Sequence, residues 1–176
     1  MQSPIFRTSY VLLYSCSYER KGEETMKVKI YSRKRMEKLL NEGELKNTAV
    51  ISFHDPQNQE YSLPPIDFSG KCARVIHVGI IDIAYDELDE YGLNEDTYFP
   101  EAEKVAQFIY EAKSDGLDII CQCEHGQSRS AGCAAAILQH FSQTGINVFT
   151  NYNCYPNVLI YHKIFNALER YKGEKL

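Results

Sequence analysis

The sequence predicts a single three-layer α/β domain, in which a central, mainly parallel sheet of about four to five strands is flanked by helices. Short apolar runs of strand length alternate along the chain with longer segments whose apolar residues recur at helical spacing, and this alternation is typical of parallel sheets. The 176 residues, 44% of them hydrophobic, are enough for one domain with a substantial core. Right-handed crossovers would place helices on both faces of the sheet.

Each element is predicted from its apolar pattern and from the residues that end it. The predicted strands span residues 27–32, 48–53, 73–81 and 117–121. The predicted helices span residues 33–40, 98–114, 130–143 and 156–171. Gly43 and Gly116 end the first two helices, and Pro100 is expected in the first turn of the second. Residues 54–70 predict a loop, and the acidic residues 82–96 predict an irregular segment with one short helix.

The first 25 residues differ from the rest and divide the chain into residues 1–25 and a domain at 26–176. Residues 5–18 are mildly apolar, but Arg7 interrupts the run and the charged residues follow it, so a signal peptide is disfavoured. Two interpretations stay open, a disordered extension or a mis-assigned start before Met26. Peptides from residues 1–25 in a mass spectrum of the native protein would contradict the second.

The net charge and the cysteines limit the classes of partner and the cellular compartment that we expect. A net charge of −5 argues against a broad basic surface, so we expect neither nucleic acid nor a membrane as a partner. No apolar stretch approaches the length of a membrane span. The six cysteines lack CxxC spacing, which disfavours a structural zinc site. A catalytic thiol in a reducing, cytoplasmic compartment is therefore expected rather than a disulfide framework.

Residues 120–130, ICQCEHGQSRS, hold the most informative pattern in the chain. Cys123 and Arg129 lie six residues apart, with Gly126 between them and Ser130 after them. A predicted strand precedes this run and an Ala-rich predicted helix follows it. Backbone N–H groups of such a loop and the helix N-terminus converge on one point and favour an anion there. The same field stabilises a thiolate, and an Arg can grip two phosphate oxygens. The run predicts a Cys nucleophile facing a phosphate site.

Cys-x5-Arg followed by Ser resembles the signature loop of the cysteine-dependent protein-tyrosine and dual-specificity phosphatases. The similarity in layout covers roughly residues 26–172, although only the loop is specific. It implies hydrolysis of phosphate monoesters through a phospho-cysteine intermediate, without a metal or another cofactor. One position departs from the family, which usually has His before the nucleophile where this chain has Gln122. Thiolate activation would then depend more on the loop amides, Arg129 and Ser130.

The resemblance also implies a role for the residues of the loop. Cys123 would attack phosphorus, Arg129 would bind phosphate, and Ser130 would hydrogen-bond the departing sulfur or cap the helix. The expected phosphate-binding residues are Glu124, His125, Gly126, Gln127, Ser128 and Arg129. We expect the carboxylate of Glu124 to point outward, and His125 either to line the mouth or to be exposed.

The remaining requirement is a general acid, which in this family is an Asp on a loop upstream of the Cys. Asp82 is favoured because it directly follows an apolar strand, which would bring it to the sheet edge that carries the Cys loop. Asp86 and Asp89 are more typical of solvated carboxylates, and Asp55 follows another predicted strand. The candidates are therefore Asp82, Asp86, Asp89, Asp96 and Asp55.

The residues of the loop also indicate the expected class of substrate and the alternative functions. The loop has no Lys, which favours phosphotyrosine or a general monoester over a highly phosphorylated lipid head group. A phosphorylated protein or a small phosphomonoester is the expected substrate, and phosphate or sulfate should occupy the loop. A non-catalytic phosphate-binding module, or sulfur or arsenate chemistry on a rhodanese-like loop, are the alternatives. Cys121 is expected in the core, and Asn157 is expected to cap the last helix. Packing or a resolving role stays open for Cys72, Cys133 and Cys154.

Overall fold

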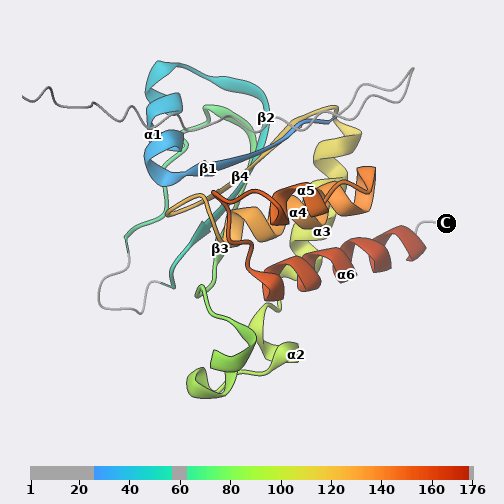
Figure 1. The fold of residues 1–176 in the computed structure, drawn as a ribbon. Helices are drawn as coiled ribbons and strands as arrows, with labels where there is room; N and C mark the ends of the chain where they lie inside the picture. The colour runs from blue at the N-terminus through green and yellow to red at the C-terminus, as the bar shows by residue number, and fades with distance from the viewer. Residues whose placement is uncertain (1–25, 57–62, 175–176) are drawn as a thin grey trace, which may run out of the picture.

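The computed structural model describes residues 26–56 and 63–174 (Figure 1). The predictions for residues 1–25, an extension or a mis-assigned start, lie outside the described residues. Among the helices within these ranges, none is long and apolar enough to cross a membrane.

One parallel sheet of four strands organises the molecule, in the order β1-β4-β2-β3. The strands are β1 (Val28–Ser32), β2 (Leu45–His54), β3 (Cys72–Gly79) and β4 (Asp118–Cys123). The prediction of a mainly parallel sheet is confirmed. Because parallel strands all end at one edge, the carboxyl ends of the four strands lie together, with Ser32 beside Cys123 and His54 beside Gly79.

The helices follow the sequence prediction at most positions. They are α1 (Arg33–Glu42), the 3₁₀ helix η1 (Tyr85–Tyr91), α2 (Glu95–Tyr98), α3 (Ala102–Ser114), α4 (Arg129–Ser142), α5 (Ile146–Phe149) and α6 (Val158–Glu174). The predicted start of the helix at 98–114 is wrong. Asn94 caps a separate short helix that ends at Tyr98, so Pro100 precedes α3 and does not lie in its first turn. The short helix α5 was not predicted.

The sheet separates two layers of unequal size (Figure 1). Along β4, Ile119, Cys121 and Cys123 pack into the large core formed with α3, α4 and α6. The alternate residue Ile120 packs in a smaller core with Met36 of α1 on the opposite face. This arrangement confirms the three-layer prediction. Cys121 is fully buried as expected, and its Sγ lies 3.5 Å from the Sγ of Cys133.

Hydrogen bonds of one histidine connect α3, α4 and α6, and their contribution to stability can be measured. The side chain of His140 of α4 is buried. Its Nδ1 donates to Glu169 of α6, and its Nε2 accepts from the hydroxyl of Tyr110 of α3. Tyr110→Phe leaves Nε2 without its donor, so the free energy of unfolding should fall by about 1–2 kcal/mol in urea titrations. Tyr91→Phe, at an exposed ring, is the control and should change nothing. An unchanged midpoint for Tyr110→Phe would contradict this role.

Candidate active site

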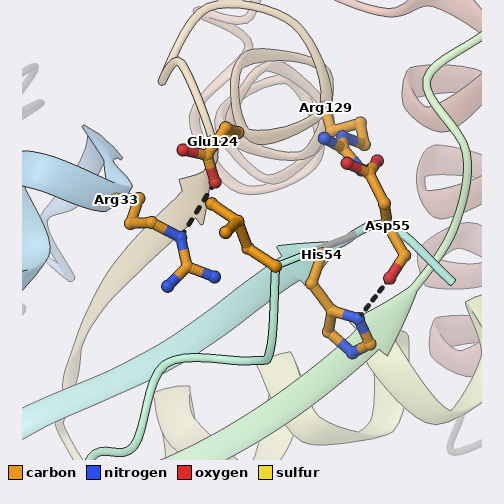
Figure 2. Close-up of a pocket in the computed structure, with 6 residues that line it drawn as sticks. Arg33, His54, Asp55, Glu124 and Arg129 are labelled. Carbon is orange, nitrogen blue, oxygen red and sulfur yellow. Dashed lines mark hydrogen bonds and ion pairs between the residues drawn. The ribbon is translucent and has the colours of Figure 1, made fainter. Parts of the chain in front are cut away.

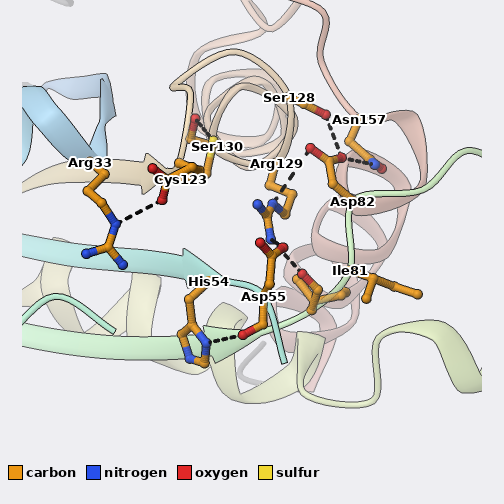
Figure 3. A network of polar contacts seen from close by, with 12 residues as sticks. Arg33, His54, Asp55, Ile81, Asp82, Cys123, Ser128, Arg129, Ser130 and Asn157 are labelled. Atoms are coloured by element: carbon orange, nitrogen blue, oxygen red, sulfur yellow. Dashed lines mark hydrogen bonds and ion pairs between the residues drawn. The ribbon is translucent and has the colours of Figure 1, made fainter. Parts of the chain in front are cut away.

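The loop at residues 123–129, called here the Cys loop, connects the end of β4 to the start of α4 (Figure 3). Cys123 is 2% exposed, and its Sγ accepts a hydrogen bond from the backbone N–H of Gly126 at 3.3 Å. The Oγ of Ser130 lies 3.1 Å from the same sulfur. Ser130 is buried inside α4, and the N-cap position is Ser128, so the hydroxyl of Ser130 faces the sulfur and does not cap the helix. Both donors suit a thiolate.

Gly126 is required by two features of the loop. Its backbone φ of +71° is a value that residues with a side chain rarely adopt. A Cβ at this position would also lie 2.6 Å from the backbone N of Ser32, at the junction of β1 and α1. Only glycine therefore allows the Cys loop to turn this close to the neighbouring strand.

The guanidinium of Arg129 is hydrogen-bonded through Nη1 but not through Nε. Its Nη1 donates to Oδ1 of Asp55 at 2.6 Å and to the carbonyl of Ile80 at 2.8 Å. The side chain is 5% exposed, yet its Nε has no hydrogen-bond partner within the described residues. A buried donor without a partner is costly, and such groups commonly face a ligand. The free hydrogen-bonding capacity of Nε marks a position where an anion oxygen can accept from it.

Asp82 lies beside the Cys loop. Its Oδ1 accepts from Ser128 Oγ at 2.7 Å and from Asn157 Nδ2 at 2.8 Å (Figure 3). Its Oδ2 has neither of these bonds and lies 3.7 Å from Arg129 Nε. The Asp82 oxygen that accepts neither of these bonds therefore faces the Nε of Arg129.

The segment after β3 positions Asp82. Ile80 and Ile83 are buried on either side of it. The hydroxyl of Tyr98 donates to the carbonyl of Ile81 at 2.8 Å, and burial raises the pKa of that phenol, so it stays a donor. Together these contacts anchor the backbone on both sides of the carboxylate.

The other carboxylates that the sequence offered lie elsewhere. Asp86 and Asp89 are on η1 and Asp96 is on α2. All three are exposed, and within the described residues no hydrogen bond or ion pair joins them to the Cys loop. Asp55 does reach the site, but as the partner of Arg129. Asp82 stays the predicted acid, now with a geometry that suits the role.

Asp55 orients Arg129, and this role can be tested. Asp55→Asn keeps an oxygen acceptor but removes its charge, which weakens a charge-assisted hydrogen bond. We expect kcat/KM for p-nitrophenyl phosphate to fall by roughly 10- to 100-fold. Asp86→Asn, at an exposed carboxylate, is the matched control. Equal values of kcat/KM for Asp55→Asn and the control would contradict the role of Asp55 in orienting Arg129.

The remaining loop residues surround this centre. The carboxylate of Glu124 turns away from the sulfur and accepts from Arg33 Nε at 2.9 Å, while the side chains of His125 and Gln127 are exposed. Gln122 is buried and its Oε1 accepts from Ser52 Oγ of β2 at 2.7 Å, so its side chain is committed to the neighbouring strand.

A cavity of about 130 Å³ lies in front of the Cys loop (Figure 2). Its lining residues are Arg33, His54, Asp55, Leu63, Glu124 and Arg129. Two arginines and two carboxylates balance its charge, and Nδ1 of His54 bonds to the carbonyl of Asp55 at 2.9 Å. The roles of Arg33, His54 and Leu63 as lining residues were not predicted from the sequence. A signal for the first two was available, because each directly follows or ends a strand at the sheet edge that carries Cys123.

Asn157 makes a second set of contacts that the sequence did not predict. Its Oδ1 accepts from the backbone N of Ile160, which confirms the predicted cap of the last helix. Its Nδ2 donates to Asp82 and to the carbonyl of Ile83. The start of α6 is therefore tied to the predicted acid.

Comparisons with known proteins support the architecture. No protein-family model matches the chain, and no curated protein matches it either. A structure of PTPMT1 in complex with PI(5)P is similar at a TM-score of 0.51 and 12% identity, covering 85% of this chain and 94% of that chain. Human tyrosine phosphatase-like serine/threonine/tyrosine-interacting protein gives 0.50 and 16%, covering 84% and 92%. A human DUSP28 variant gives 0.51 and 17%, also covering 84% and 92%. The chain therefore has the α/β fold of the dual-specificity phosphatases.

Proposed function

We propose that this protein is a cysteine-dependent phosphatase that hydrolyses phosphate monoesters, with phosphotyrosine as the favoured substrate. The observation that supports this most is Arg129, which is held through Nη1 and whose buried Nε has no hydrogen-bond partner among the described residues. A guanidinium held in this way is preorganised to bind a phosphate oxygen. The phosphate would then lie next to the thiol of Cys123, which belongs to the same loop.

In the first half of the reaction, the Cys123 thiolate attacks phosphorus and the bond to the leaving oxygen breaks. Asp82 gives that oxygen a proton, for which Oδ2 is available because Oδ1 already accepts two hydrogen bonds. The amides of the Cys loop and Arg129 stabilise the charge on the equatorial oxygens of the transferring group.

In the second half, water attacks the phospho-cysteine and gives a proton back to Asp82 while the S–P bond breaks. Cys123 leaves as a thiolate, which Ser130 Oγ and the N–H of Gly126 stabilise by hydrogen bonding. Inorganic phosphate is released and the starting protonation states are restored.

The charge around the cavity supports the substrate choice. Each arginine of the cavity is paired with a carboxylate, Arg33 with Glu124 and Arg129 with Asp55. A head group with several phosphates would meet these carboxylates, whereas a single phosphoryl group needs only the Cys loop. PTPMT1 was crystallised with PI(5)P, so a phosphoinositide belongs in the substrate panel as the comparison.

The test is phosphate release by the full chain from p-nitrophenyl phosphate, a phosphotyrosine peptide and a phosphoinositide. We expect turnover of the first two. A non-catalytic phosphate-binding module is the alternative, and Gln122 favours it because an uncharged side chain replaces the usual His and bonds to Ser52. Phosphate binding in calorimetry without any turnover would establish the alternative. Sulfur transfer from thiosulfate or reduction of arsenate would reject both.

A further inference from the structure

A long segment without acidic residues, Lys or Arg follows the Cys loop in the chain, and part of it is exposed. Residues 130–162 contain no Asp, Glu, Lys or Arg, although 24% of the chain is charged. The first part of this stretch is the buried helix α4, but the part from α5 to the start of α6 is largely exposed. Five large apolar or aromatic side chains are exposed there, Ile146, Phe149, Tyr152, Tyr155 and Val158. These five residues are called the α5–α6 surface.

The backbone of this segment is attached directly to the Cys loop. The N–H of Tyr155 donates to the carbonyl of Gln127 at 2.9 Å, and the N–H of Asn157 donates to that of Ser128 at 3.2 Å. Cys154, which directly precedes Tyr155, packs against the large core. Burial raises the pKa of its thiol, and the nearby Cys123 adds to the effect. The α5–α6 surface therefore begins at the rim of the candidate active site.

The segment is ordered by its own contacts. The N–H of Cys154 donates to the carbonyl of Asn151, and Oδ1 of Asn151 accepts from the N–H of Asn153. Phe149 packs edge-on against Tyr161 with ring centroids 5.2 Å apart. Tyr152 and Tyr155 nevertheless remain 80% and 71% exposed. A fixed backbone that presents exposed tyrosines can bind with little loss of entropy.

The residue types of the α5–α6 surface favour a polypeptide as its partner. Exposed tyrosines with few charges are typical of protein-binding surfaces, because Tyr contributes apolar area and a hydroxyl together. An anionic membrane or a polyanion would need basic residues, and residues 130–162 contain none. Since the surface continues from the rim of the Cys loop, a chain bound there would extend from a phosphorylated residue in the site.

We propose that the α5–α6 surface binds the polypeptide that flanks the phosphorylated residue, with apolar side chains of the substrate packing on Tyr152 and Tyr155. The inference rests on the proposed function and deepens it: the substrate is a phosphorylated protein, and its flanking residues are apolar rather than charged.

The experiment uses two pools of phosphotyrosine peptides, one with Leu, Ile and Val around the phosphotyrosine and one with Ser and Gly. In the double variant Tyr152→Ala/Tyr155→Ala, kcat/KM for the apolar pool should fall by roughly 10- to 30-fold. Its kcat/KM for p-nitrophenyl phosphate and for the Ser/Gly pool should change by less than about 2-fold. The control is Tyr85→Ala/Tyr91→Ala, which removes two exposed rings from η1 and should leave all three substrates unchanged.

Several outcomes would overturn the inference. Equal losses of kcat/KM for all three substrates would mean that the two tyrosines support the Cys loop. Equal kcat/KM of the wild type for the two peptide pools would mean that apolar flanking residues are not preferred. Sedimentation that detects a dimer lost in the Tyr152→Ala/Tyr155→Ala variant would assign the surface to self-association. Binding to phosphatidylcholine vesicles that disappears in the same variant would assign it to a membrane.

A binding measurement separates this inference from the proposed function. Fluorescence anisotropy with the Cys123→Ser protein reports peptide affinity without requiring chemistry. A preference for the apolar pool that depends on the two tyrosines would support the surface even if the wild type turned over no phosphomonoester. Turnover of p-nitrophenyl phosphate without that preference would support the phosphatase and reject the surface.

Discussion

Replacing Cys123 with Ser should abolish phosphate release, with a loss of at least about 10⁴-fold in kcat for p-nitrophenyl phosphate. A serine hydroxyl is not ionised near neutral pH, and the two groups that contact the sulfur of Cys123, the N–H of Gly126 and the hydroxyl of Ser130, are not bases. Neither group can remove a proton from Ser. Steady-state release of nitrophenol and of inorganic phosphate would measure the loss.

The same variant should still bind phosphate, because the loop amides and the Nε of Arg129 are unchanged. Calorimetry with inorganic phosphate checks this expectation and shows that the variant is folded. Cys72→Ser, at a half-buried thiol of β3, is the matched control and should keep the wild-type rate. Activity that survives in Cys123→Ser would exclude the phospho-cysteine route altogether.

Much of the fold could be predicted because local patterns determine it. The apolar run of β4 and the helical spacing of α4 both lie next to the Cys loop, so the positions of Cys123 and Arg129 followed from neighbouring residues. Asp82 could be favoured because parallel strands end at one edge of the sheet. The start of α3 was misplaced, since apolar spacing alone does not reveal that Asn94 caps an independent turn.

The contacts that complete the site could not be predicted, because they join residues far apart in the chain. Asp55 reaches Arg129 across 74 positions, and Asn157 reaches Asp82 across 75. Several aspartates precede Cys123 in the chain, and the sequence alone does not say which of them meets the guanidinium; only the packed structure selects Asp55. The same holds for Gln122, whose partner Ser52 lies on the adjacent strand.

Asp82→Asn should lower kcat for a phosphotyrosine peptide by roughly 10²- to 10⁴-fold, which is the usual contribution of a general acid. The amide keeps the size of the side chain and an oxygen for Ser128 and Asn157, but it has no proton to give from the position of Oδ2. The loss should be smaller for p-nitrophenyl phosphate, because nitrophenolate leaves without needing a proton. Rates measured over a series of phenyl phosphates should therefore depend more steeply on the leaving group in the variant.

The pH profile distinguishes the acid from a residue that only supports the Cys loop. A general acid must be protonated, so the wild-type kcat should fall as pH rises, and Asp82→Asn should lose that fall while keeping the limb that reports the nucleophile. Ser128→Ala, which removes one donor to Oδ1 but leaves the carboxyl group, should lose about tenfold and keep the wild-type profile. Asp86→Asn should match the wild type in both measurements. A profile with an unchanged basic limb in Asp82→Asn would return the acid role to another carboxylate, and Asp55 would then be the next to test because it also contacts Arg129.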